Sequence, residues 1–173
     1  LHGIAVATLI VILLRERGYL TDVVGERQLY NLGQLLFGLS TFWAYLWVSQ
    51  YLLIWYSNLP EETVYYFSRT DTDWIWLFLL NLALNWAIPF FILMPKAAKH
   101  SPFILRRVCI VLLVGHWVDL CVTIFHKVVG ISLIGPLELG ITLGYGALFL
   151  FVVGRALTRA PLVPQNDPRL EAD

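Results

Sequence analysis

The chain has 173 residues, of which 58% are hydrophobic and 14% are charged, with a net charge of zero and a mean hydropathy of +0.70. Soluble domains carry about 25% charged residues, so this composition excludes an ordinary soluble domain and predicts an integral membrane protein. A chain without net positive charge also gives no reason to expect a nucleic-acid partner.

The first apolar run covers residues 1–14 and ends at Arg15, Glu16 and Arg17. Fourteen residues are too few to cross a bilayer, which takes about 20 helical residues. A signal peptide has its basic residues before the apolar run rather than after it. We therefore interpret residues 1–14 as the end of a transmembrane helix that begins upstream, and the sequence as the C-terminal portion of a longer polypeptide. Residues 15–28 then form a loop.

Four longer apolar runs follow, and each is long enough to cross a bilayer as a helix. The predicted fold is an all-α integral membrane protein. It is an up-down four-helix transmembrane bundle over residues 29–157, together with the end of the preceding helix. The four predicted spans are 29–56, 74–94, 103–125 and 135–157.

Lysine and arginine residues fall almost entirely in alternate loops, which indicates the orientation of the bundle. Of the twelve, only Arg69 and Lys127 lie on the other side. Basic loops stay in the cytoplasm, so the C-terminus is predicted to be cytoplasmic. The ten residues on the cytoplasmic side are Arg15, Arg17, Arg27, Lys96, Lys99, Arg106, Arg107, Arg155, Arg159 and Arg169.

The outer loop 57–73 and the C-terminal tail 158–173 differ in their predicted structure. Pro60 followed by Glu61 and Glu62 is a typical helix start, because proline fits the first turn and acids favour its positive end. The loop is therefore predicted to form a short helix at the membrane surface. The tail contains three prolines and few apolar residues, so we expect an extended cytoplasmic segment.

Ionisable residues within the third span are the strongest functional candidates. His116 and Asp119 are three residues apart and so share a helix face. His116 lies about 15 Å along the helix from Arg106, near the middle of the membrane. A carboxylate stabilises a protonated imidazole, so the two residues are predicted to form a proton-accepting pair. The alternative interpretation is a structural pair that joins helices.

Three further polar sites lie in the other spans. Glu138 near the outer end of the fourth span either pairs with Lys127 or ends a proton route. Asn81 and Asn85 are one turn apart and precede Pro89, which removes the helical donor to the carbonyl of Asn85. In one interpretation, Asn81, Asn85 and Tyr45 hold bridging water at the resulting kink. In the alternative, the two amides form hydrogen bonds between helices.

No ligand set for a metal is present in the sequence. The two cysteines, Cys109 and Cys121, lie inside one apolar run and form no CxxC pattern, so we interpret them as packing residues. No catalytic residues are assigned. A chain without haem or iron–sulphur ligands cannot itself carry electrons across a membrane.

Several motifs resemble one membrane-protein family. They are LGQLLF at 32–37, FWAY at 42–45, SQYLLIWY at 49–56, PEET at 60–63, NWAIPF at 85–90, VGHWVDL at 114–120 and PLVP at 161–164. Together they resemble the ActF subunits of bacterial alternative complex III, which are NrfD-like integral membrane proteins. The resemblance extends over essentially the whole chain.

The resemblance implies a location in the bacterial cytoplasmic (inner) membrane and a set of partners. The partners are a sister NrfD-like membrane subunit, an iron–sulphur subunit and haem c subunits, so iron–sulphur clusters and haem c belong to other chains. It also implies contact with the quinone pool, with menaquinone as a candidate ligand. Family members have ten helices in two four-helix bundles and a helix pair, and this chain matches the second bundle.

Three functional interpretations remain open. The first is a proton pathway and scaffold in a quinol:electron-acceptor oxidoreductase of respiratory or photosynthetic electron transport. The second is direct quinone binding, and the third is a purely structural membrane anchor. The proton pathway would use His116, Asp119, Glu138, Asn81, Asn85 and Tyr45, and a quinone would contact His116, Trp117, Tyr45 and Trp47.

Overall fold

The computed structural model describes residues 1–21, 23–70, 74–125, 136–159 and 162, and these contain helices and no strand. Its α-helices are α1 (His2–Glu16), α2 (Glu26–Ser57), α3 (Pro60–Thr70), α4 (Trp74–Leu82), α5 (Ile88–Leu93), α6 (Lys96–His100), α7 (Pro102–Leu120) and α9 (Pro136–Leu157). Two π-helical segments, η1 (Ala83–Ala87) and η2 (Cys121–Phe125), continue α4 and α7.

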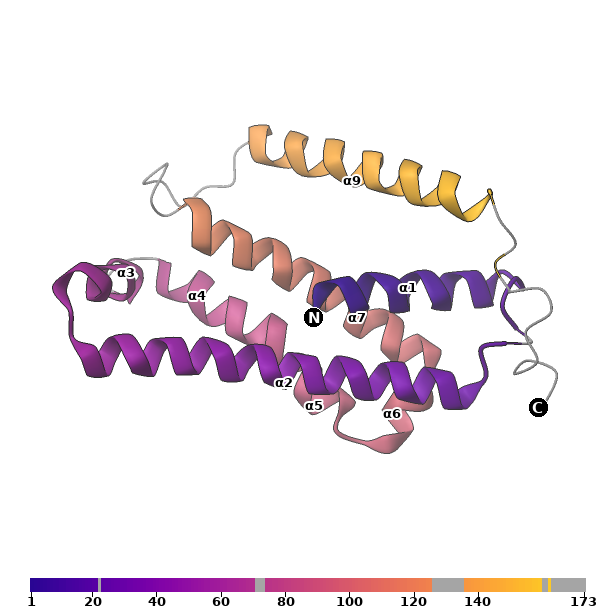
Figure 1. Cartoon of the computed structure of the whole chain (residues 1–173), viewed down its shortest axis with the longest axis horizontal. Helices are drawn as coiled ribbons and strands as arrows, with labels where there is room; N and C mark the ends of the chain where they lie inside the picture. The colour runs from indigo at the N-terminus through magenta and orange to yellow at the C-terminus, as the bar shows by residue number, and fades with distance from the viewer. Residues whose placement is uncertain (22, 71–73, 126–135, 160–161, 163–173) are drawn as a thin grey trace.

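The long helices lie side by side, and the chain reverses direction between them (Figure 1). The end of α1, the start of α2, the short helix α6 and the end of α9 lie at one end of the molecule, and α3 lies at the other. The predicted basic loops therefore share one end of the structure. The predicted helix in the loop 57–73 is confirmed as α3, which begins at Pro60 with Glu61 and Glu62 in its first turn.

Among the described residues, three helices are long and apolar enough to cross a membrane. They are Trp74–Leu93, Pro102–Ile124 and Leu139–Leu157, and they agree closely with three of the four predicted spans. Helix α2 is longer, at 32 residues, but it is not among the three. The hydropathy of α2 is lowered by its polar and aromatic side chains. The polar ones include Ser40, Thr41, Ser49 and Gln50.

Helix α2 has a defined signal at each end. The side-chain Oε1 of Gln28 accepts a hydrogen bond of 3.1 Å from the backbone N–H of Gly25, which satisfies a donor that the first helical turn leaves free. At the other end Asn58 adopts a left-handed conformation with φ of 48°, which asparagine tolerates better than most residues. Pro60 then starts α3, so the chain turns sharply between the two helices.

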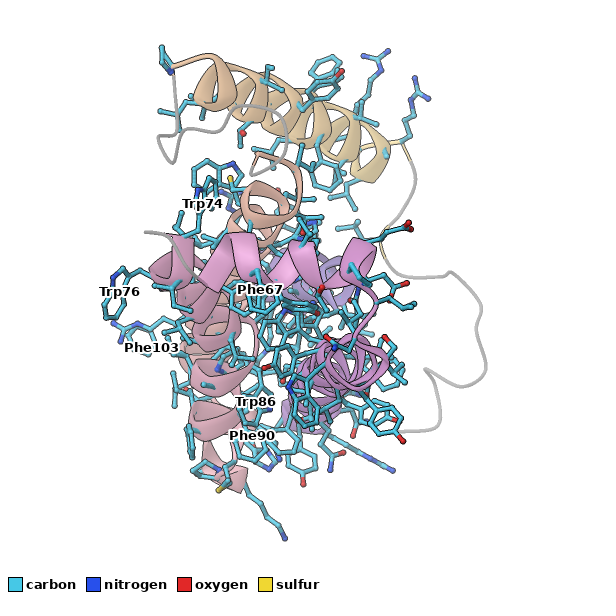
Figure 2. All side chains as sticks on the ribbon, turned by 90° about the vertical axis from the view of Figure 1, so that its left-hand side faces the viewer. Phe67, Trp74, Trp76, Trp86, Phe90 and Phe103 are labelled. Atoms are coloured by element: carbon cyan, nitrogen blue, oxygen red, sulfur yellow. The ribbon has the colours of Figure 1, made fainter. Side chains whose placement is uncertain are left out.

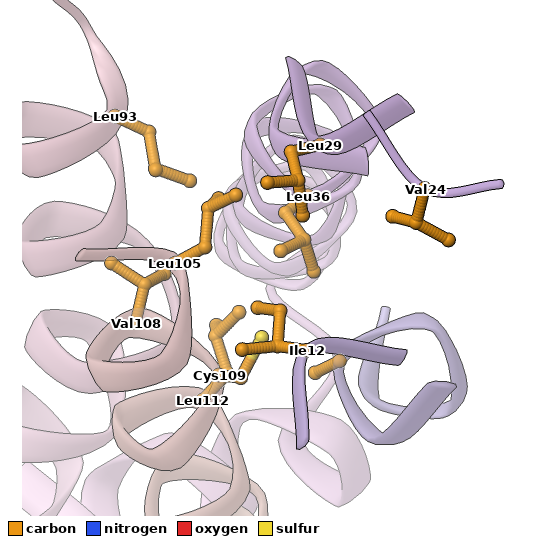
Figure 3. Close-up of a cluster of buried hydrophobic side chains, with 10 residues drawn as sticks. Ile12, Val24, Leu29, Leu36, Leu93, Leu105, Val108, Cys109 and Leu112 are labelled. Atoms are coloured by element: carbon orange, nitrogen blue, oxygen red, sulfur yellow. The ribbon is translucent and has the colours of Figure 1, made fainter. Parts of the chain in front are cut away.

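A cluster of buried apolar side chains joins α1, α2, α5 and α7 (Figure 3). The cysteine Cys109 belongs to this cluster, and both cysteines are free and buried, as expected of packing residues. Inside a membrane such contacts stabilise the bundle mainly through van der Waals packing. The cluster consists of Ala5, Ile12, Val24, Leu29, Leu36, Leu93, Leu105, Val108, Cys109 and Leu112.

A second cluster connects α3 to the bundle. Tyr66 of α3 packs edge-on against Phe78 of α4, with 6.1 Å between the ring centroids, and Val118 and Val122 complete the cluster. Trp76, on the opposite side of α4, projects away from the other helices (Figure 2) and is 74% exposed. The face of α4 that carries Phe78 and Asn81 is therefore its interior face.

Helix α9 lies apart from the rest of the bundle (Figures 1 and 2). It connects to α7 through the indole Nε1 of Trp117, which donates a hydrogen bond of 3.1 Å to the hydroxyl of Thr142. A Cβ built at Gly140, Gly144 or Gly146 would meet no described atom within 4 Å. These small residues, which would favour close helix packing, therefore form no such contact within the described part of the chain.

The first prediction concerns the apolar cluster. Leu36→Ala should lower the free energy of unfolding by about 2–5 kcal/mol, because Leu36 is fully buried and truncation leaves a cavity. Leu53→Ala on the same helix is the control, since Leu53 is 70% exposed. Thermal unfolding in detergent micelles measures both. Equal melting temperatures for the two variants would contradict the packing described here.

Candidate functional site

A chain of polar side chains crosses the interior of the bundle. Nε2 of His2 lies 2.9 Å from Oδ1 of Asn85. The Nδ2 of Asn85 donates to Oδ1 of Asn81 at 2.6 Å, and the Nδ2 of Asn81 donates to Oδ1 of Asp119 at 2.8 Å. Helices α1, α4 and α7 and the segment η1 are thus joined by three successive hydrogen bonds. Both asparagines are essentially inaccessible to solvent.

The π-helical segment η1 places Asn85 within this chain. Pro89 cannot donate a backbone hydrogen bond, and immediately before it the backbone widens so that the N–H of Ile88 bonds to the carbonyl of Ala83. Single π-turns of this kind often mark functional sites. Nδ2 of Asn85 also donates to the backbone carbonyl of Asn81 at 3.1 Å, which ties the side chain to its own helix.

Gly115 allows α7 to come close to Asn85. A Cβ built at Gly115 would lie 2.9 Å from Oδ1 and 3.0 Å from Nδ2 of Asn85. Contacts below 3.0 Å force a neighbouring group to move, and Asn85 is held by its bonds to Asn81 and His2. The glycine at position 115 therefore leaves the space that the buried amide occupies.

His116 and Asp119 contact different helices. The ring of His116 stacks on that of His2, with 3.9 Å between centroids and 21° between planes, whereas Asp119 accepts the bond from Asn81. Nδ1 of His116 is buried without a hydrogen-bond partner among the described residues. Two charged rings at about 4 Å would repel each other by about 4 kcal/mol at an effective dielectric constant of about 20, so a doubly charged pair is disfavoured.

His2 is a site residue that the sequence analysis did not assign. Residues 1–14 were interpreted only as a helix end, although an ionisable residue in an apolar segment is itself a sign of function. Its ring reaches His116 because α1 runs antiparallel to α7. The opposite ends of these helices are joined by an ion pair of 2.9 Å between Arg106 and Glu16.

A cavity of about 400 Å³ adjoins the Asp119 end of the polar chain. Aromatic rings form part of its wall, and Trp47 and Phe78 are tilted against each other with centroids 4.7 Å apart. Asp119 and Asn81 contribute polar atoms to the same wall. The full lining is Trp43, Leu46, Trp47, Gln50, Tyr65, Tyr66, Phe78, Asn81, Asp119, Val122 and Thr123.

The structure brings only some of the predicted site residues together. Tyr45 is 64% exposed and stacks on Phe42, away from the polar chain. Of the four predicted quinone contacts, Trp47 lines the cavity, while Trp117 bonds to Thr142 of α9. Position 138 belongs to α9, but the side chain of Glu138 lies outside the described residues, as does Lys127, so their predicted pairing remains a prediction.

Among the residues that the structure describes, no three His, Cys, Asp or Glu side chains come close enough to hold a metal ion. No protein-family model matches this chain, and no curated protein matches it.

The second prediction tests the close contact at Gly115. Gly115→Ala should destabilise the protein by about 1–3 kcal/mol, because the added methyl group displaces the amide of Asn85. Gly38→Ala on α2 is the control, since nothing lies within 4 Å of a Cβ there and helical alanine is favoured over glycine by about 0.5–1 kcal/mol. Thermal unfolding should move in opposite directions for the two variants. A gain in stability for Gly115→Ala would show that the amide is not confined.

Proposed function

We propose that this chain is a proton-handling membrane subunit of a quinol:electron-acceptor oxidoreductase of the alternative complex III type. The observation that carries the proposal is the buried hydrogen-bond chain from His2 through Asn85 and Asn81 to Asp119, with His116 stacked on its first member. Ionisable groups are costly in a membrane interior and usually serve ion or proton movement. Asp119 faces a cavity large enough for water, so it is the group that would exchange protons.

The proposed arrangement has four spanning helices, with α2 as the fourth. At 32 residues α2 is about 48 Å long, more than the thickness of a hydrocarbon core of about 30 Å. The basic loops lie at the end of the molecule opposite α3, whose first turn is acidic. Under the positive-inside rule, the proposal has the C-terminus in the cytoplasm and α3 at the outer surface. The resemblance to ActF subunits implies that the membrane is the bacterial inner membrane.

Partners supply the electron carriers in this proposal. The sequence holds no motif for haem or an iron–sulphur cluster, so these cofactors are assigned to the haem c and iron–sulphur subunits. The resemblance to ActF subunits indicates a sister NrfD-like subunit beside this one. The span of α9 has no buried residue and offers apolar surface for such a neighbour or for lipid.

The third prediction tests the proton role in the reconstituted complex. Asp119→Asn should lower proton-coupled turnover by about 100-fold, a typical loss when a group that donates and accepts protons is removed. His116→Ala should also lower it. Ser49→Ala on α2 is the control, because Ser49 belongs neither to the polar chain nor to the cavity lining. Quinol oxidation and proton release are measured together, and normal turnover with an unchanged proton-to-electron ratio in Asp119→Asn would refute the role.

Quinone binding is a second candidate, favoured by the chemistry of the same cavity. Quinone sites combine apolar aromatic walls with a few hydrogen-bonding groups. Trp43, Trp47 and Phe78 offer such walls, and Gln50 and Asn81 offer amides. A menaquinone head group bound there would lie next to Asp119, which could exchange the protons of the quinol.

The fourth prediction separates the cavity-lining face of α2 from its exposed face. Trp47→Ala should raise the dissociation constant of a soluble menaquinone analogue by about tenfold, because it removes an aromatic wall of the cavity. Tyr45→Ala, on the exposed face, should leave it unchanged. Tryptophan fluorescence quenching in nanodiscs measures both. Equal affinities would remove the quinone candidate, and a negative result in both this and the proton assay would leave the structural anchor.

A further inference from the structure

All donors in the polar chain point toward Asp119. Nδ2 of Asn81 faces the carboxylate, and Nδ2 of Asn85 faces Oδ1 of Asn81. The remaining atom of the Asn85 amide, Oδ1, faces Nε2 of His2. An amide oxygen can only accept a hydrogen bond, so Nε2 of His2 must carry a hydrogen.

The backbone prevents this chain from reversing. Nδ2 of Asn85 also donates to the main-chain carbonyl of Asn81, 3.1 Å away. Turning the amide over would place Oδ1 of Asn85 against that carbonyl oxygen, two acceptors without a hydrogen between them. The backbone of α7 at Gly115 lies so close to the amide that a methyl group there would meet it at 2.9 Å. The tautomer of His2 is thus set by the helix that faces it.

We propose that His2 is a further proton-carrying residue of this site, held by Asn85 with a hydrogen on Nε2, so that the stacked His2–His116 pair takes up a single proton. The free position for it is Nδ1 of His2 or a nitrogen of His116. The functional role of His2 rests on the proposed proton-handling function. The protonation state of His2 can be measured independently of that function.

The close stacking of the two rings limits the pair to one proton. On α7, His116 lies against the ring of His2, and Asp119 ends the amide chain. A second proton would place two cations face to face. Water supplies the single proton and takes it back, while Asn81 and Asn85 keep all their hydrogens and only transmit the field of the Asp119 carboxylate.

Histidine nitrogen resonances test this directly in the full chain, labelled with ¹⁵N-histidine and embedded in lipid nanodiscs. The His2→Asn variant assigns the signals of His2. At pH 8.5 we expect His2 to carry its hydrogen on Nε2, and on acidification to pH 5 we expect His2 and His116 together to gain one proton. Asn85→Ala should convert His2 to a mixture of tautomers, and Thr8→Val on the same helix should change nothing.

Three outcomes would overturn the inference. They are a hydrogen on Nδ1 rather than Nε2 of neutral His2, two fully charged rings at pH 5, or an unchanged His2 spectrum in Asn85→Ala. If Asn85→Ala does not fold, Gly115→Ala replaces it, because its added methyl group displaces the same amide. A fixed Nε2 tautomer combined with normal turnover of Asp119→Asn would reject the proton-handling role and leave the assignment of His2 intact.

Discussion

The hydrogen bonds of the Asn85 side chain are the constraint on which the interior of this bundle depends. A buried amide without partners costs about 1–3 kcal/mol by mutational measures, and this one bonds to Asn81 within its own helix and to His2 of α1, while Gly115 lets α7 pack closely against it. These contacts connect α1 and α7 to the segment formed by α4 and η1. The same amide that carries the polar chain therefore also holds the helices in register.

Much of the fold follows from the sequence because long apolar runs admit few structures in a membrane. The runs at 74–94, 103–125 and 135–157 predicted three spans to within a few residues, and Pro60 with its two following acids located α3. The short helix α6 was not anticipated. The separation of α9 from its neighbours was not anticipated either. Glycines four residues apart indicate that a helix can pack closely, but they do not indicate which surface packs against it.

The candidate site was predictable in its members but not in its connections. Asn81, Asn85, His116 and Asp119 stand out as polar residues in apolar runs, yet helical spacing suggested that His116 and Asp119 act as a pair. The structure instead places each against a different helix and links them through His2 and two amides. The interhelical partner of a side chain depends on helix rotation and on π-turns, which one-dimensional periodicity does not encode.

The length of α2 has a consequence for where the cavity opens. A rod of about 48 Å in a hydrocarbon layer of about 30 Å would have to tilt by about 50° to fit, beyond the usual range of up to about 40°. With α2 crossing as proposed, its excess length extends beyond the layer. Where that excess lies at the α3 end, Tyr65 and Tyr66, which line the cavity together with Asp119, sit at the level of the lipid head groups. A molecule diffusing in the plane of the leaflet could enter sideways, without first leaving the membrane for water.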